Sequence, residues 1–341
     1  MMATARAWTA WALTVFCSAL LLTAFSGRQV DAQSAKAPLK IVVFDGPSVD
    51  HDAVWMAIAK GFYKEEGLEV TTRIFPSGTV AFQSFHAGEG DIIMGGELSA
   101  LSRWRNSDPD YRVIMDLERD SQSYIAVVRN DIKTAADLKG KTIGVLKGAS
   151  GQWFLSEYLA KNHLAESDVT VKNLGNPVLP VALCQGDIQG LFSWQPRGTR
   201  TMAICGKDVH YLSNAEGYMR GYNLAGARAS WLATPEGREA AMRFVKATAK
   251  GSKVAASDFA AVYAYAKEKF GMSEEDVKEG YKYLVRPLAF DAGFFSDFCS
   301  LSQWAQSADI IKGKSDLSGF VWTDGIKAVD PKLVAVTPPP C

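Results

Sequence analysis

The residues best placed to do chemistry in this sequence are small and polar side chains in loops that each follow a predicted strand. The five loops are residues 46–49, 77–79, 95–97, 148–151 and 193–195. Ser or Thr beside Gly at a helix start exposes backbone N–H groups at the positive end of the helix dipole, which suits an anionic group. For any single loop, ordinary helix capping by Ser77, Thr79 or Ser150 is the simpler interpretation. The recurrence of the pattern in both halves of the chain favours a binding site.

Two larger side chains in these loops have two open interpretations each. Glu97 follows Gly95-Gly96 at the end of a predicted strand. Its carboxylate either accepts hydrogen bonds from an amino or amide group of a ligand or caps the next helix at the surface. Trp194 either stacks on a flat ligand or packs in an apolar core.

Motifs of catalysis and metal binding are missing from the sequence. The histidines at positions 51, 86, 163 and 210 have no metal-ligand spacing, and neither a Gly-x-Ser-x-Gly elbow nor a phosphate-binding Gly-x-x-x-x-Gly-Lys loop occurs. His51 between Asp50 and Asp52 resembles a base with its orienting group, but a helix start rich in Asp explains it more simply. We therefore expect no catalytic residue, no metal and no cofactor.

The elements that must position these loops alternate between strand and helix. Short apolar runs at 39–44, 68–75, 91–94 and 111–117 are separated by segments with helical spacing, which predicts a mostly parallel sheet. A second series of strands is expected at 124–128, 142–146, 169–174, 188–192 and 209–212, and a return strand at 223–232. Beyond Pro235 we predict helices almost throughout.

A repeated phrase suggests that these two series form two similar halves. Gly90-Asp-Ile92 and Gly186-Asp-Ile188 each end a helical stretch and open a short apolar one. Two lobes built alike suggest a ligand cleft between them. The strand at Tyr124 has no helix before it, and Gly217 and Gly221 precede the return strand, so we expect the chain to cross between lobes near 121–124 and 218–223.

The N-terminus reads as a secretory signal peptide: Arg6 precedes an apolar stretch, and Val30-Asp-Ala32 offers small residues for cleavage. Without residues 1–32 the chain has 35 basic and 36 acidic residues, so no excess of positive charge is available to hold nucleic acid.

Export would place Cys184, Cys205, Cys299 and Cys341 in an oxidising compartment. A Cys184–Cys205 bridge and buried free thiols are both open interpretations, as is a Cys299–Cys341 bridge.

Several phrases in order along the chain carry a resemblance to a known family. They are residues 59–70, 88–92, 132–144 with the core Asp137-Leu-Lys-Gly-Lys-Thr-Ile143, 186–188 and 194–196. The chain resembles the nitrate/sulfonate/taurine class of ABC-transporter substrate-binding proteins, some of which bind thiamine precursors. The resemblance covers about residues 39–250 and is poor over the C-terminal residues.

This resemblance implies an α/β type II periplasmic-binding-protein fold, with two lobes joined by two crossover segments. The expected domains are a signal peptide (1–32), a first lobe (33–121 and 220–341) and a second lobe (122–219). The implied protein is a periplasmic monomer that delivers a small anionic or heterocyclic nutrient to a permease and its ATPase. It is not expected to be an enzyme. A sensing subunit and a pyrimidine-synthase-like enzyme are the alternatives.

In open α/β sheets a ligand lies outside the carboxyl ends of the strands, so we expect a set of ligand-binding residues drawn from both lobes. They are Pro47, Ser48, Ser77, Gly78, Thr79, Gly96, Glu97, Ser121, Ala149, Ser150, Gly151, Trp194, Gln195 and Tyr222.

Overall fold

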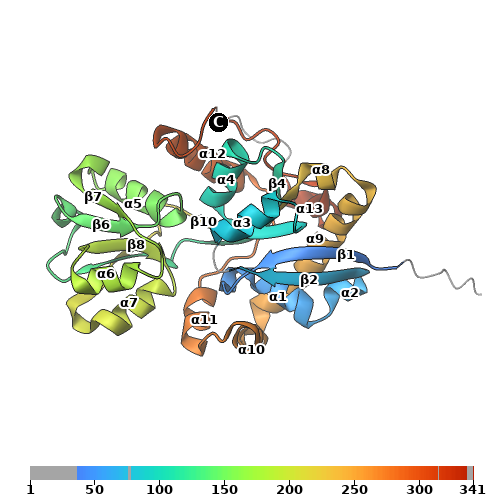
Figure 1. Cartoon of the computed structure of the whole chain (residues 1–341), viewed down its shortest axis with the longest axis horizontal. Coiled ribbons are helices and arrows are strands. Elements are labelled where there is room, and N and C mark those ends of the chain that lie inside the picture. Colours follow the sequence, from blue (N-terminus) through green and yellow to red (C-terminus); the bar gives the residue numbers. More distant parts are fainter. Residues whose placement is uncertain (1–36, 76–77, 314, 336–340) are drawn as a thin grey trace, which may run out of the picture. The chain divides into compact units, whose positions relative to one another are not determined.

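The computed structural model describes residues 37–75, 78–313, 315–335 and 341. The predicted signal peptide, residues 1–32, lies outside this part of the chain. The residues from Pro38 to Cys341 form one unit, which contains two sheets with their own helices (Figure 1).

The first sheet has five strands in the order β2-β1-β3-β10-β4. Their bounds are β1 Leu39–Asp45, β2 Leu68–Ile74, β3 Ile92–Gly96, β4 Tyr111–Asp120 and β10 Gly221–Arg228. Strand β1 pairs in parallel with β2 and β3, whereas β10 runs antiparallel to both β3 and β4. The strand that returns from far along the chain therefore lies inside the first sheet, between β3 and β4.

The second sheet repeats this plan with the order β7-β6-β8-β5-β9. Its strands are β5 Tyr124–Arg129, β6 Thr142–Val145, β7 Thr170–Asn173, β8 Gly190–Trp194 and β9 Val209–Asn214. Strand β6 is parallel to β7 and β8, and β5 is antiparallel to β8 and β9. In each sheet, four of the five described strands run in the same direction, which confirms the expectation of a mostly parallel sheet. The strand that enters from the other half runs against its neighbours, so both sheets are mixed.

The two Gly-Asp-Ile phrases occupy equivalent places in this plan. Each leads into the third parallel strand of its sheet, β3 in the first and β8 in the second, and each of these strands borders the antiparallel one. In the first copy, the Asp91 carboxylate accepts a hydrogen bond from the Val42 backbone N–H at 2.8 Å, which ties the phrase to β1. The sequence repeat therefore marks a structural repeat.

Helices surround both sheets (Figure 1). Those of the first half are α1 Asp52–Ala59, α2 Phe62–Glu65, α3 Gly78–His86 and α4 Glu97–Asn106, and those of the second are α5 Ser150–Lys161, α6 Leu179–Gln185 and α7 Arg197–Cys205. The C-terminal part adds α8 Ala229–Leu232, α9 Pro235–Ser257, α10 Phe259–Phe270, α11 Glu274–Tyr281, α12 Ala292–Ser307 and α13 Asp324–Val329. Helix α9 packs along α1 and reaches β1 and β4 of the first sheet. Its close approach to α1 needs Gly251, where a Cβ would meet the Ala57 backbone nitrogen at 2.7 Å.

The chain passes between the sheets twice, once between β4 and β5 through residues 121–123 and once between β9 and β10 through residues 215–220. This confirms the predicted fold class with its two crossover segments. The return strand ends at Arg228, earlier than predicted, because Ala229–Leu232 turns into α8, where the Asp110 side chain binds Ser230. Helix α7, which the sequence reading did not assign, follows Pro196.

Disulfides join Cys184 to Cys205 and Cys299 to Cys341. The first links the end of α6 to the end of α7, two helices that pack on each other. The second ties α12 to the last residue of the chain. Both pairings that the sequence left open are therefore formed. Of the helices described, none combines the length and apolar character that a membrane span needs.

Candidate functional site

Three polar side chains share one face of the first sheet at the end of β4. Glu118 lies opposite Asn223 in the antiparallel pairing with β10, and Asp120 lies opposite Gly221. Directly opposed residues project to the same face, as do residues two apart in a strand. Glu118, Asp120 and Asn223 therefore lie side by side, each at most 5% exposed.

A β-bulge decides which acidic residues of β4 belong to this face. The register slips between Asn223 and Leu224, so that Leu224 pairs with Asp116 rather than with Leu117. The extra residue turns Asp116 to the opposite face. There its carboxylate accepts a 2.7 Å bond from Arg119, which also binds Asp291 of the loop before α12.

The loop after β1 contributes a fourth polar group to the Glu118 face. The Asp50 carboxylate accepts a 2.7 Å hydrogen bond from the Asn223 amide. Next to it, the His51 imidazole bonds to Asp45 at 2.8 Å. Burial by itself would lower the pKa of His51, but the hydrogen bond to Asp45 and the charge of Asp50 outweigh it, so the pKa is raised.

Glu97 occupies the first position of α4 and is fully buried. It is therefore not the surface cap that the sequence allowed. Its carboxylate accepts a 3.1 Å bond from the Tyr222 backbone N–H. Burial raises its pKa, while hydrogen bonds from the Ser150 hydroxyl and from Tyr222 act in the opposite direction. Because Ser150 starts α5 of the second half, Glu97 joins elements of both halves.

Aromatic groups of the second half lie against this acidic face. Gly221 leaves room for the Tyr124 ring, since a Cβ there would collide with it. The Tyr124 and Trp194 ring centroids are 6.5 Å apart, and the Arg197 guanidinium stacks on Trp194 at 4.5 Å. The pKa of Arg197 is lowered to about 10, mainly by burial and then by repulsion from Arg200, with Asp50 opposing both.

We call Asp50, Glu97, Glu118 and Asp120 the acidic cluster. Burial, followed by the charge of Asp50, raises the pKa of Glu118 well above its ordinary value. Burial also raises the pKa of Asp120 to about 6, although the Gln122 and Ser123 N–H groups stabilise its charged form. The pKa of the Tyr124 phenol is raised by burial and then by the charges of all four carboxylates.

Much of the cluster lacks partners within the protein. Among the described residues, Glu118 Oε2, Asp50 Oδ1 and Asn223 Oδ1 are buried atoms without a hydrogen-bond partner. The nearby cation Arg286 binds Asp52, and no ion pair in the described part of the chain reaches Glu97, Glu118 or Asp120. Since an unpaired buried acceptor is costly, such a group calls for a functional explanation.

The predicted site residues fall into three groups in the structure. Gly96, Glu97, Ser150 and Trp194 lie at the strand and helix ends that border the cluster, and a Cβ at Gly96 would lie 3.6 Å from the Ser150 hydroxyl. Pro47, Ser48, Ser121, Ala149 and Gly151 lie in or beside the same loops, and Gly151 packs against the Phe192 carbonyl of β8. Ser77 lies outside the described residues, and Gly78 and Thr79 open α3.

Two predicted side chains are engaged elsewhere. The Gln195 amide oxygen accepts bonds from the backbone and hydroxyl of Thr199 at 3.1 Å, and its nitrogen donates to Tyr211. It thus caps the start of α7. The Tyr222 ring points to α12, where it packs on Phe298 and donates to Asp297. Only the Tyr222 backbone faces Glu97.

The sequence reading missed Glu118, Asp120, Asn223 and Tyr124. Glu118 and Asp120 had one available signal, since alternating acidic residues at the end of an apolar strand are unusual on a buried sheet. For Asn223 no local pattern pointed to a site.

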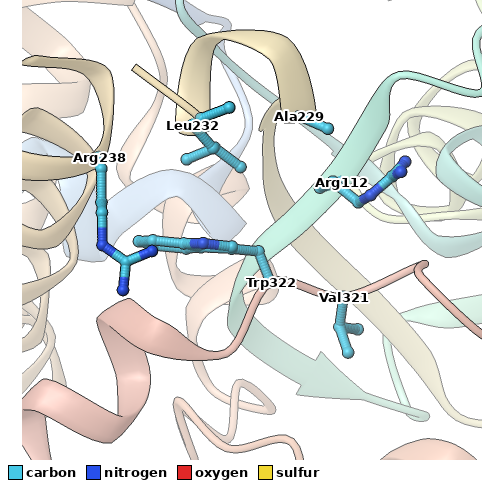
Figure 2. A pocket seen from close by; sticks show the side chains of 7 residues that line it. Arg112, Ala229, Leu232, Arg238, Val321 and Trp322 are labelled. Carbon is cyan, nitrogen blue, oxygen red and sulfur yellow. The ribbon is translucent and has the colours of Figure 1, made fainter. Parts of the chain in front are cut away.

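One other arrangement is a weaker candidate. Figure 2 shows a pocket of about 270 Å³ between α8 and the segment before α13, where Arg112 and Arg238 flank Trp322. Arg238 is paired with Asp324 at 2.6 Å and Arg112 donates to the Pro109 carbonyl, so both cations already have partners. Across the described residues, no three His, Cys, Asp or Glu side chains are grouped to hold a metal ion.

Comparison with known proteins agrees with this architecture. The family model described as NMT1/THI5 like matches residues 48–259. The chain belongs to this NMT1/THI5-like family. The match includes both Gly-Asp-Ile phrases and the whole second sheet, and it confirms the resemblance found in the sequence.

Individual relatives are more distant. A protein of Brucella abortus (strain 2308), named as a binding protein, is 28% identical over 141 residues, or 41% of this chain. The match spans 43% of that relative's length. The periplasmic aliphatic sulphonate binding protein SsuA from Escherichia coli is 15% identical, with a TM-score of 0.72 over 84% of this chain and 98% of its own. The desulfurization enzyme DSZB has a TM-score of 0.65 at 17% identity, covering 86% of this chain and 99% of its own.

Members of this fold therefore include periplasmic binding proteins and an enzyme. The structural likeness establishes the two-lobed fold of the chain, and its activity has to be argued from the site.

Proposed function

We propose that this protein is the periplasmic substrate-binding component of an ABC importer. In this proposal it captures a small nutrient between its two halves and delivers it to a permease with its ATPase. The observation that carries the proposal is that unpartnered polar groups at the strand ends of the first half lie beside aromatic side chains of the second half. A ligand in an α/β fold of this type binds at the carboxyl ends of the strands.

The contacts between the halves support capture by closure. The Glu97 carboxylate accepts a bond from Tyr222 of the first sheet and lies near the Ser150 hydroxyl of the second half, so a ligand here would touch both. Two crossover segments allow a rotation of one half against the other without refolding. A ligand that binds the closed state more tightly shifts the population towards it.

The proposed binding set keeps the loop residues predicted from the sequence and adds the acidic face. Glu97, Ser150 and Trp194 are its central members, together with the loops around Pro47 and Ser48, Gly78 and Thr79, Gly96, Ser121, and Ala149 and Gly151. The Gln195 and Tyr222 side chains act indirectly, by holding α7 and β10 in place. A small anionic or heterocyclic nutrient is the general ligand class suggested by the family resemblance.

The proposed location is the periplasm. The sequence of residues 1–32 supports export, and the two disulfides fit an oxidising compartment. The SsuA neighbour is described as a periplasmic binding protein. A sensing subunit that presents the same site to a membrane receptor would use the same closure and is separated from the importer by uptake measurements.

The proposal is tested with residues 33–341, produced with both disulfides formed. A thermal-shift screen covers nitrate, sulfonates, carboxylates, pyrimidines and amines, because a ligand that binds only the native state raises Tm. A hit is then measured by small-angle scattering, where closure reduces the radius of gyration while circular dichroism stays constant. Uptake of the hit by cells with and without the gene tests transport. Turnover of the hit in solution would support an enzyme instead.

A further inference from the structure

The acidic cluster bears on which ligand the site accepts. This inference rests on the proposed function and concerns the charge of the ligand. The structural neighbour SsuA is described as binding a sulphonate, which is an anion. In this chain, the groups at the strand ends of the first half are carboxylates.

The pairing of β4 with β10 decides the face of the sheet to which these carboxylates project. Glu118 and Asn223 are cross-strand partners on one face, and Asn223 reaches Asp50 at 2.7 Å on that face. Glu118 Oε2 and Asn223 Oδ1 are unpartnered, and their residues are 3% and 5% exposed. Both atoms are acceptors, so the group that satisfies them must be a hydrogen-bond donor.

Of the arginines around the cluster, Arg286 and Arg119 are paired with other carboxylates, and Arg197 has no ion pair in the described part of the chain. Arg286 forms two bonds with Asp52, and Arg119 lies on the opposite face with Asp116 and Asp291. Arg197 is stacked on Trp194. A bound anion would therefore meet at least three acidic side chains at close range, which is repulsive in a poorly hydrated site.

The aromatic side of the site suits a cation equally well. Tyr124 and Trp194 present two rings 6.5 Å apart beside the carboxylates. The face of an aromatic ring attracts cations. Carboxylates with an aromatic wall form a site for a positively charged group that carries several N–H donors.

We propose that the site takes an organic cation, a ligand with a protonated amine, amidine or guanidine group held by Glu118, Asp50 and the Asn223 carbonyl. Glu97 and Asp120 add negative potential, and the Tyr124 and Trp194 rings cover the bound group. The ligand of this chain thus has the opposite charge to that named for SsuA.

The test is a binding comparison sorted by charge, with residues 33–341 at pH 7.5. The cationic probes are benzamidine, agmatine and putrescine, and the anionic probes are benzenesulfonate, methanesulfonate and nitrate. We expect at least one cationic probe to raise Tm and to bind by calorimetry, and none of the anions to do so. Glu118→Gln should weaken binding of that cation by about 10-fold to 100-fold, as expected for a lost charge-assisted hydrogen bond.

A matched control is Glu89→Gln, which changes an exposed carboxylate paired with Arg73. It should leave the affinity unchanged. Binding of an anionic probe, or unchanged cation affinity in Glu118→Gln, overturns the cationic ligand. In the first case the capture function survives. If no probe and no member of the nutrient screen binds, both proposals are wrong.

Discussion

The unpartnered carboxylate of Glu118 should make the ligand-free protein less stable than it could be. Glu118 is 3% exposed, and the charges of Asp50, Asp120, Asp116 and Asp52 add to burial in raising its pKa. Replacing it by Gln removes the charge and keeps the shape. We therefore expect Glu118→Gln to stabilise the ligand-free protein at neutral pH, while it weakens binding.

The magnitude follows from the neighbouring residue on the same face. The pKa of Asp120 rises from 3.8 to about 6, and this shift corresponds to about 3 kcal/mol. The amide introduced by Glu118→Gln would itself lack a partner, which costs about 1–2 kcal/mol. The net gain for Glu118→Gln is then about 1–2 kcal/mol, or a rise in Tm of a few degrees.

The effect of these carboxylates on the stability of the folded protein depends on pH. A carboxyl whose pKa is raised on folding is deprotonated first in the unfolded chain, so the folded state loses stability as the pH rises towards the folded pKa. Asp120, with a pKa of about 6, and Asp116, with a pKa of about 7, place this loss between about pH 4 and pH 7. The charges of Asp50, Asp120, Asp116 and Asp52 act on the pKa of Glu118, and Glu118 in turn acts on Tyr124 and Arg286.

Urea unfolding of ligand-free wild type and Glu118→Gln at pH 4.5, 6 and 7.5 measures the effect. The difference should be largest at pH 7.5 and smallest at pH 4.5, where Glu118 is protonated. Glu66→Gln is the control, and it should lower the stability of the protein where Glu118→Gln raises it. Burial favours a higher pKa for Glu66, but the bonds from Lys246 and Lys250 outweigh burial and lower that pKa. A Glu118→Gln protein that is less stable than wild type at pH 7.5 would refute the reasoning.

Three further outcomes are expected. Gly221→Ala should push the Tyr124 ring away and destabilise the protein by about 1–3 kcal/mol, the usual cost of overpacking, whereas Gly175→Ala, with 3.9 Å to its nearest neighbour, should be nearly neutral in the same unfolding experiment. Replacing Cys184 and Cys205 together by Ala should lower the unfolding free energy by about 3 kcal/mol, since the bridge closes a loop with a separation of 21 residues. Scattering curves with and without a saturating ligand should show compaction, and equal radii of gyration would contradict closure.

The order of strands and helices could be read from the sequence because it depends on local patterns. Short apolar runs between helical segments predicted the strands of both sheets, and the repeated Gly-Asp-Ile phrase predicted two similar halves. The crossings near 121–124 and 218–223 followed from a strand without a preceding helix and from two glycines. In each case, residues close in sequence carry the information, through side-chain periodicity and backbone preference.

The acidic face was decided by tertiary structure. Asn223 meets Glu118 only because β10 returns into the first sheet and pairs with β4, and the bulge beside them turns Asp116 away from Glu118. The same pairing turns the Tyr222 ring towards α12. From the sequence, Tyr222 was instead expected to contact the ligand. Register between distant strands depends on the packing of both faces at once, which a local pattern does not encode. The sequence by itself therefore determined the two halves and the loops at their strand ends, and the long-range pairing of β4 with β10 determined which charges those loops face.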